Sequence, residues 1–167
     1  MTQGEVILLR LLNTKSYYGY ELDKIIEANQ MRRWADLGFS SIYNILGGLE
    51  KKELVTSRFE KVHGSPRRKV YEITELGRQK LRKEVRRMIE RPAEIHDDFT
   101  VGVVASDILS NKDFHYSIAE YRQYLADKLK RFEKEMPDAV RSKERVSLAF
   151  SRSRYLIEAE IRWIDQQ

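Results

Sequence analysis

Residues 37–77 read LGFSSIYNILGGLEKKELVTSRFEKVHGSPRRKVYEITELG, and this stretch decides the fold. Its first part carries apolar side chains at the three- and four-residue spacing of a helix, namely Ile42, Ile45, Leu46 and Leu49. The pattern predicts an amphipathic helix, and we expect Ser40 or Ser41 to cap it by accepting a hydrogen bond from a free amide. One face of this helix is therefore buried, and the other is left for solvent or for a partner.

A short hairpin is predicted after the helix. Residues 54–60 and 69–73 alternate between apolar and polar side chains, which is typical of paired strands. Residues 61–68 between them contain a glycine, a proline and the start of a run of three cations. An amphipathic helix followed by a two-stranded hairpin with a cationic tip indicates a winged helix-turn-helix. In that fold the helix enters the major groove of DNA, and the tip (the wing) reaches the phosphates or the minor groove.

The rest of the N-terminal half is predicted to be helical. Apolar patterning predicts helices over residues 2–13 and 17–29, and Thr74 is a good N-cap for a fourth helix. We expect this fourth helix to be buried through Leu76, Leu81, Val85, Met88 and Ile89. Pro92 ends it, so a winged helix-turn-helix domain is assigned to residues 1–92.

The C-terminal part, residues 93–167, is predicted to be an α-helical dimerisation domain. An irregular bridge over residues 93–110 precedes a helix with heptad-like apolar spacing, and a last helix with a broad apolar face ends near residue 165. We expect these helices to need a second copy of the chain to cover their apolar surfaces. The predicted dimerisation residues are Phe114, Ile118, Tyr121, Leu125, Phe132, Phe150, Ile157, Ile161, Trp163 and Ile164. The fold class is thus mainly α with a small two-stranded β wing.

Charge is distributed unevenly along the chain. Residues 1–92 hold 19 Lys and Arg against 12 Asp and Glu, a balance of +7, whereas residues 93–167 hold 12 against 14, a balance of −2. A basic half joined to a slightly acidic half favours polyanion binding at one end of the chain and protein contact at the other.

Several classes of function are disfavoured. The chain has no cysteine, which excludes disulfides, thiolate metal sites and cysteine nucleophiles. The three histidines lack metal-ligand spacing, and no nucleophile triad or phosphate-binding glycine loop is present, so we expect no enzyme, no metal and no cofactor. No apolar run approaches the roughly 20 residues of a membrane span, and no secretory signal is apparent, so a cytoplasmic location is expected.

Candidate DNA-binding residues lie on the third helix and on the wing. They are Ser40, Ser41, Tyr43, Asn44, Gly47, Lys51, Arg67, Arg68 and Lys69. Tyr43 and Asn44 are expected to contact base edges or phosphates, and the three wing cations to neutralise phosphates. An ordinary solvated helix face and hairpin is the alternative. Gly47 and Gly48 are either a place where DNA approaches closely or a tolerated helix defect. Tyr20 and Tyr71 are expected to pack in the core.

Five groups of residues in order along the N-terminal half make the chain similar to the PadR family of bacterial transcriptional regulators. They are Tyr18-Gly19-Tyr20-Glu21-Leu22, Ser41-Ile42-Tyr43, Leu54-Val55, Arg67-Arg68-Lys69-Val70-Tyr71 and Ile73-Thr74-Glu75-Leu76-Gly77-Arg78. The C-terminal half resembles the longer, virulence-activator type of helical module through Leu109-Ser110-Asn111-Lys112-Asp113 and Glu160-Ile161-Arg162-Trp163-Ile164. The family usually has proline at Asn44, longer polar residues at Gly47 and Gly48, and glycine at Glu53.

The resemblance implies a homodimeric repressor that binds a palindromic operator in double-stranded DNA. It also implies that a small effector, sometimes phenolic, often releases the repressor. Within the same class, an activator or a ligand-independent repressor is the alternative. A winged-helix adaptor that binds protein and not DNA is the alternative from another class.

Overall fold

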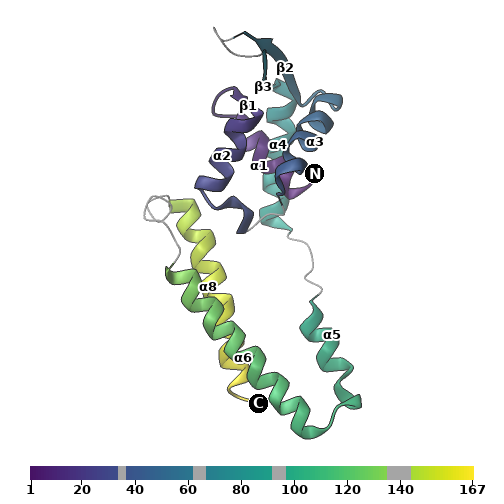
Figure 1. Ribbon diagram of the computed structural model, residues 1–167, viewed down its shortest axis with the longest axis vertical. Coiled ribbons are helices and arrows are strands. Elements are labelled where there is room, and N and C mark those ends of the chain that lie inside the picture. Colours follow the sequence, from purple (N-terminus) through teal and green to yellow (C-terminus); the bar gives the residue numbers. More distant parts are fainter. Residues whose placement is uncertain (34–36, 62–66, 92–96, 135–143) are drawn as a thin grey trace. The chain divides into compact units, whose positions relative to one another are not determined.

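The computed structural model describes residues 1–33, 37–61, 67–91, 97–134 and 144–167. The chain divides into two compact units, Met1–Glu94 and Ile95–Gln167 (Figure 1). Most described residues are helical and the strands form one small antiparallel sheet, so the predicted fold class is confirmed. Trp34, the wing tip over residues 62–66, and Glu94 and His96 of the linker lie outside the described residues.

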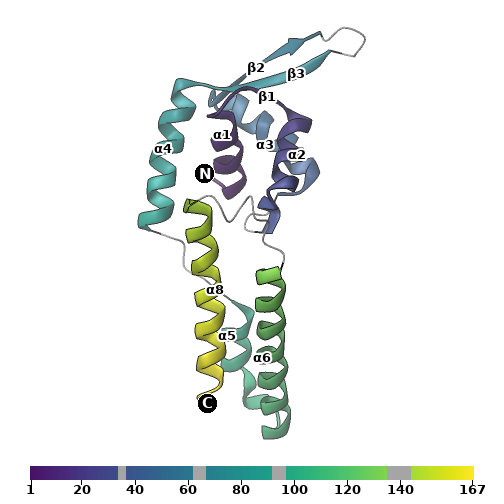
Figure 2. The ribbon, with the colours of Figure 1, turned by 90° about the vertical axis from the view of Figure 1, so that its left-hand side faces the viewer.

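Unit 1 consists of helices packed against one end of a small sheet (Figure 2). Its elements are α1 (Gln3–Leu12), β1 (Tyr17–Tyr18), α2 (Gly19–Ala28), η1 (Met31–Arg33), α3 (Phe39–Lys51), β2 (Val55–Glu60), β3 (Arg68–Ile73) and α4 (Glu75–Glu90). The core lies between the helices and the sheet. Its fully buried side chains include Leu8, Leu9, Leu22, Ile42, Leu46 and Leu49. The apolar face predicted for the third helix is thus its buried face.

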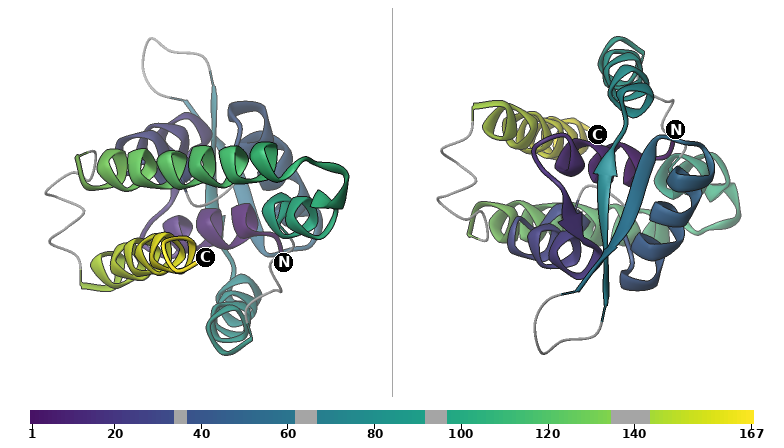
Figure 3. Two further views of the ribbon diagram at one scale, coloured as in Figure 1. Left: turned by 90° about the horizontal axis from the view of Figure 1, so that it is seen from below. Right: turned by 90° about the horizontal axis from the view of Figure 1, so that it is seen from above.

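The sheet has three strands in the order β1-β3-β2, one more than the hairpin predicted from sequence. Tyr17 faces Tyr71 and Tyr18 faces Val70, so β1 pairs with β3 where a helix had been predicted. A two-residue strand has no measurable alternation, and only its partner defines it. The β2–β3 hairpin runs across the ends of the helices and extends beyond them (Figures 2 and 3).

α4 begins as predicted but is less buried than predicted. Thr74 caps it by accepting a hydrogen bond from the amide of Gly77 at 2.9 Å. Of the five side chains expected to be buried, Leu81 is buried and Met88 is half-buried, whereas Leu76, Val85 and Ile89 are exposed. The helix packs against α1 on one side, and the three exposed apolar side chains lie on the more open part of its surface.

Unit 2 contains α5 (Asp98–Val104), η2 (Ser106–Ile108), α6 (Asn111–Lys134) and α8 (Glu144–Ile164). The bridge predicted as irregular therefore holds a short helix, which Asp97 caps by accepting from the amide of Thr100 at 2.9 Å. Phe99 attaches α5 to the longer helices, because its ring stacks on Tyr121 and meets Trp163 edge-on.

α6 and α8 pack side by side and bury part of the predicted dimer seam within the chain (Figures 1 and 2). Leu125, Ile157 and Ile164 form a buried cluster, with Ile118, Tyr121 and Ile161 packed around it. Phe132 packs against the buried Phe150, and the Tyr121 hydroxyl donates to Glu160 at 2.6 Å. Four of the ten predicted dimerisation residues are thus buried between the helices of one chain, namely Leu125, Phe150, Ile157 and Ile164, whereas Trp163 stays exposed.

Candidate nucleic-acid interface

The third helix is capped two or three residues earlier than predicted, and in a different way. Gly38 is its N-cap in extended conformation and has no side chain to cap with. The Ser41 hydroxyl donates to the carbonyl of Gly38, instead of accepting from an amide, and Ser40 lies in the first turn. The predicted serine cap is thus incorrect, because the helix begins at Phe39 and both serines lie within it.

The outward face of α3 presents polar side chains and bare backbone. Tyr43 is 43% exposed, and Asn44 and Lys51 are exposed as well. A Cβ built at Gly47 or Gly48 would meet nothing within 4 Å in the described structure. Neither glycine is needed for packing inside unit 1, although each weakens the helix by roughly 1 kcal/mol relative to alanine.

Tyr43 also has a packing role that sequence reasoning did not find. Its ring lies against Gly19 at the start of α2, so closely that a Cβ at residue 19 would be 2.6 Å from Tyr43 Cε1. α2 and α3 therefore approach each other through this glycine. One part of the ring fixes the two helices, and the exposed part remains available at the surface.

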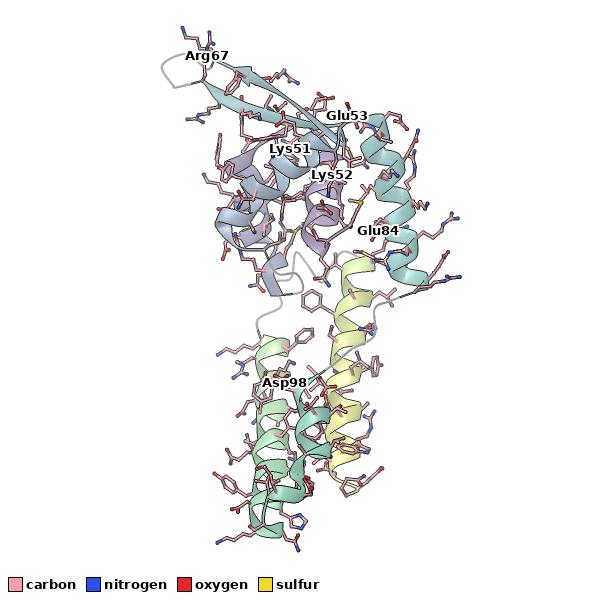
Figure 4. The ribbon with its side chains drawn as sticks, turned by 90° about the vertical axis from the view of Figure 1, so that its right-hand side faces the viewer. Lys51, Lys52, Glu53, Arg67, Glu84 and Asp98 are labelled. Atoms are coloured by element: carbon pink, nitrogen blue, oxygen red, sulfur yellow. The ribbon has the colours of Figure 1, made fainter. Side chains whose placement is uncertain are left out.

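The wing cations are held in different ways. Arg67 is exposed and lies at the far end of the hairpin, whereas Lys51 and Lys52 lie at the corner between α3 and β2 (Figure 4). Arg68 is exposed, stacks over the Tyr20 ring at 5.2 Å, and donates from Nη1 to the Tyr20 hydroxyl at 3.1 Å. Tyr20 is therefore a surface residue, 36% exposed, and not the core residue that was predicted.

Lys69 is half-buried and paired with Glu50. Its ammonium lies 2.7 Å from Glu50 on α3, and the Ser57 hydroxyl donates to the other oxygen of the same carboxylate. The hydrogen bond from Lys69, and then that from Ser57, lowers the pKa of Glu50 below its ordinary value. The hydrogen bond to Glu50 in turn raises the pKa of Lys69. This contact ties the end of α3 to both strands of the wing.

Tyr71 packs in the core as predicted, with an exposed fraction of 6%. Burial raises the pKa of its hydroxyl. Nothing in the sequence spacing could have revealed Glu50, Ser57 or Tyr20, because each meets its partner across the fold.

The site has the properties of a binding surface. The described residues contain no group of three His, Asp or Glu placed to hold a metal ion. None of the described helices is long and apolar enough to cross a membrane. Together α3 and the wing present exposed hydrogen-bonding groups beside exposed cations. This arrangement suits a polyanion that also offers hydrogen-bonding base edges, such as duplex DNA.

A helix pair in which α2 packs against α3, followed by a cationic β-hairpin, defines the winged helix-turn-helix class. The model of the transcriptional regulator PadR-like family matches residues 8–83, which include this helix pair and the hairpin. A protein of Lysinibacillus sphaericus, described only as uncharacterized protein X, is 34% identical over 97 residues, covering 58% of this chain and 87% of the relative. The chain belongs to the PadR-like family of transcriptional regulators.

Solved structures share the fold over nearly the whole chain. Bacillus subtilis PadR in complex with operator DNA is 18% identical with a TM-score of 0.75, covering 97% of this chain and 95% of that one. The same protein in complex with p-coumaric acid is 17% identical, with a TM-score of 0.74 and coverage of 97% and 91%. The Vibrio cholerae virulence activator AphA is 21% identical, with a TM-score of 0.68 and coverage of 98% and 95%.

Proposed function

We propose that the protein is a dimeric transcriptional repressor that binds a palindromic operator in duplex DNA. The observation that carries the proposal is the surface of α3, where Tyr43, Asn44 and Lys51 are exposed beside the cationic start of the wing. In this proposal α3 enters the major groove, and the wing lies on the flanking backbone.

Each candidate residue has a distinct role in this proposal. Asn44 reads a base edge, since an asparagine amide can pair with adenine through two hydrogen bonds. Lys51, Arg67 and Arg68 neutralise phosphates. Ser40 and Ser41, at the start of α3, contact the sugar-phosphate backbone of the DNA. Lys69 acts by fixing the wing to α3, because its ammonium is already paired with Glu50.

The glycine pair on α3 supports a close approach by DNA. Gly47 and Gly48 reduce helix stability, and the described structure shows nothing that a methyl group at either position would touch. Residues that destabilise a helix without improving packing inside the unit are expected where a binding partner must come close to the helix backbone. Bare backbone on this face would let α3 lie closer to the floor of the groove.

Dimerisation is proposed through unit 2. Unit 2 leaves large apolar side chains exposed that α6 and α8 do not cover, among them Val101, Val104, Ile108, Tyr116, Leu148 and Tyr155. Of the residues predicted from sequence, Trp163 remains 45% exposed, whereas Leu125, Phe150, Ile157 and Ile164 are buried within the chain. A two-fold dimer would present two α3 helices to half-sites one helical turn, or a multiple of a turn, apart.

A small effector is proposed to release the protein from DNA. The family and the fold shared with a protein solved with p-coumaric acid support a small, phenolic ligand. Such a ligand works by binding better to a dimer geometry in which the α3 helices do not match the operator. A panel of phenolic acids, scored by release of a bound duplex, tests this part. If the duplex stays bound with every acid, the effector part of the proposal is rejected.

Selection of bound sequences from a random pool of duplex DNA tests the DNA-binding function directly. We expect an enriched palindrome with a fixed half-site spacing. Enrichment of one asymmetric site would reject the two-fold arrangement, and no enrichment would reject sequence-specific binding.

Salt dependence separates a DNA regulator from a protein-binding adaptor. Affinity for the selected duplex should fall steeply between low and moderate salt. In Arg67→Ala/Arg68→Ala the slope of log K against log salt should become shallower by roughly 0.9 for each phosphate that is no longer neutralised. Affinity that ignores both salt and these substitutions would favour the adaptor.

A further inference from the structure

Opposite charges face each other at the last cross-strand pair before the wing tip. Glu60 ends β2 and Arg68 begins β3, and the two are cross-strand partners in the antiparallel register. Oppositely charged partners at such positions normally attract each other across the hairpin. Within the described residues these two form no ion pair with each other.

Two tyrosines from one short segment bind these two residues instead. The Tyr18 hydroxyl donates to Glu60 Oε2 at 2.8 Å, and Arg58 pairs with Glu60 Oε1 at 2.8 Å. The Tyr20 hydroxyl accepts from Arg68 Nη1 at 3.1 Å, and the Tyr20 ring lies under the guanidinium. Both carboxylate oxygens of Glu60 are therefore engaged without Arg68.

The tyrosines hold each other in place as well. Their rings stack with centroids 5.7 Å apart and planes 12° from parallel. Tyr18 lies in β1, which pairs with β3, and Tyr20 lies in the first turn of α2. The base of the wing is thereby tied to the helix that precedes α3.

We propose that Tyr18 and Tyr20 are positioning residues for DNA binding, which keep Arg68 away from Glu60 so that its charge is available to a phosphate. The proposal rests on the proposed function, in which the wing contacts the DNA backbone. A guanidinium has five N–H donors, and the hydrogen bond to Tyr20 uses one donor of Nη1 and leaves the positive charge uncompensated. An ion pair with Glu60 would compensate that charge and lower the attraction for DNA.

The test is a charge rescue in the full-length protein. Tyr18→Phe keeps the ring and removes only the hydroxyl that holds Glu60. We expect Arg68 to pair with the released carboxylate, so that affinity for the selected duplex falls roughly tenfold, as for the removal of one charge-assisted hydrogen bond. The salt dependence should become shallower by roughly 0.9 for each phosphate that Arg68 no longer neutralises. Adding Glu60→Gln to Tyr18→Phe should restore both values, because the competing charge is gone.

Controls separate positioning from a general loss of structure. Tyr17→Phe is the matched control, since Tyr17 is a neighbouring tyrosine in β1 whose hydroxyl meets Thr14 and not the wing. It should bind DNA like the parent protein. In an Arg68→Ala background, Tyr18→Phe should have no further effect on affinity.

The outcomes distinguish this proposal from the proposed function. If the parent protein binds duplex DNA with steep salt dependence but Tyr18→Phe is unchanged, or is not rescued by Glu60→Gln, the positioning role is wrong. If the parent protein does not bind duplex DNA at all, the proposed function itself fails.

Discussion

Glu53 adopts a backbone conformation that few residues other than glycine favour. Its φ is 58°, in the left-handed region, just after the C-cap of α3 at Lys52. The amide of Leu54 donates to the carbonyl of Leu49 and the amide of Glu53 donates to that of Glu50, which together form a Schellman motif. Glycine would adopt this conformation without strain.

Replacing Glu53 by glycine should stabilise unit 1. Glu53→Gly removes the Cβ strain of the left-handed conformation, which costs roughly 1–2 kcal/mol. We expect a gain of about 1 kcal/mol in the free energy of unfolding, measured by urea denaturation. Glu53→Ala is the matched control, because it removes the charge but keeps the Cβ. A gain of the same size in the alanine variant would show that charge, and not backbone conformation, limits stability.

Alanine at the two glycines of α3 should separate stability from binding. Gly47→Ala and Gly48→Ala should each raise the free energy of unfolding by roughly 1 kcal/mol, because the added methyl group meets open space. If DNA approaches this face, the same variants should bind the selected duplex more weakly. Gly102→Ala, on the open side of α5, is the control for helix stability. Unchanged DNA affinity in both α3 variants would contradict the close approach.

At the scale of elements, one buried carboxylate fixes α1 to the end of α3. Glu5 is 7% exposed and completes a capping box with Thr2 at the start of α1. The Lys52 ammonium donates to Glu5 Oε1 at 2.6 Å. Burial acts to raise the pKa of Glu5, but the hydrogen bonds from Lys52 and from the Thr2 amide act against it, and the net pKa is lowered.

Removal of the Lys52 ammonium should therefore destabilise the protein in a pH-dependent way. Lys52→Met leaves a buried carboxylate without its partner, and we expect a loss of about 1–2 kcal/mol at pH 7. Because the folded pKa of Glu5 is lowered, its contribution is present above the unfolded pKa and is lost as pH falls through the folded pKa. The two proteins should thus converge in stability as the pH falls from 4.5 through the folded pKa of Glu5.

Urea denaturation at pH 7 and at about pH 3 measures this convergence. The matched control is Lys51→Met, since Lys51 is an adjacent exposed lysine that has no ion pair within the described part of unit 1. A constant difference between Lys52→Met and the parent protein at both pH values would exclude the Glu5 contact as its cause.

At the scale of the whole molecule, the proposed function requires two copies of the chain. Sedimentation should give the mass of a dimer at micromolar concentration, about twice the 19.8 kDa of one chain. The dimer should persist in Arg67→Ala/Arg68→Ala, because the wing takes no part in the proposed contact. A single chain at these concentrations would contradict the two-fold mode of DNA binding.

The sequence by itself determined the elements whose side chains follow a regular spacing or a local capping signal. Helical spacing at Ile42, Leu46 and Leu49 fixed the buried face of α3, and Thr74 marked the start of α4. These features are local, so a one-dimensional pattern is enough to predict them. The outward positions of α3 followed from the same periodicity.

Only the tertiary structure decided which partner each side chain meets. It added β1 to the sheet, paired Lys69 with Glu50, and brought Arg68 to Tyr20. It also buried Leu125 against α8, where the sequence had predicted a contact with a second chain. Apolar spacing shows that a face will be covered, but the same stripe fits a neighbouring helix or another subunit. Whether a helix of the same chain or a second subunit covers the face depends on segments far apart in sequence. A local pattern holds no information about contacts between such segments.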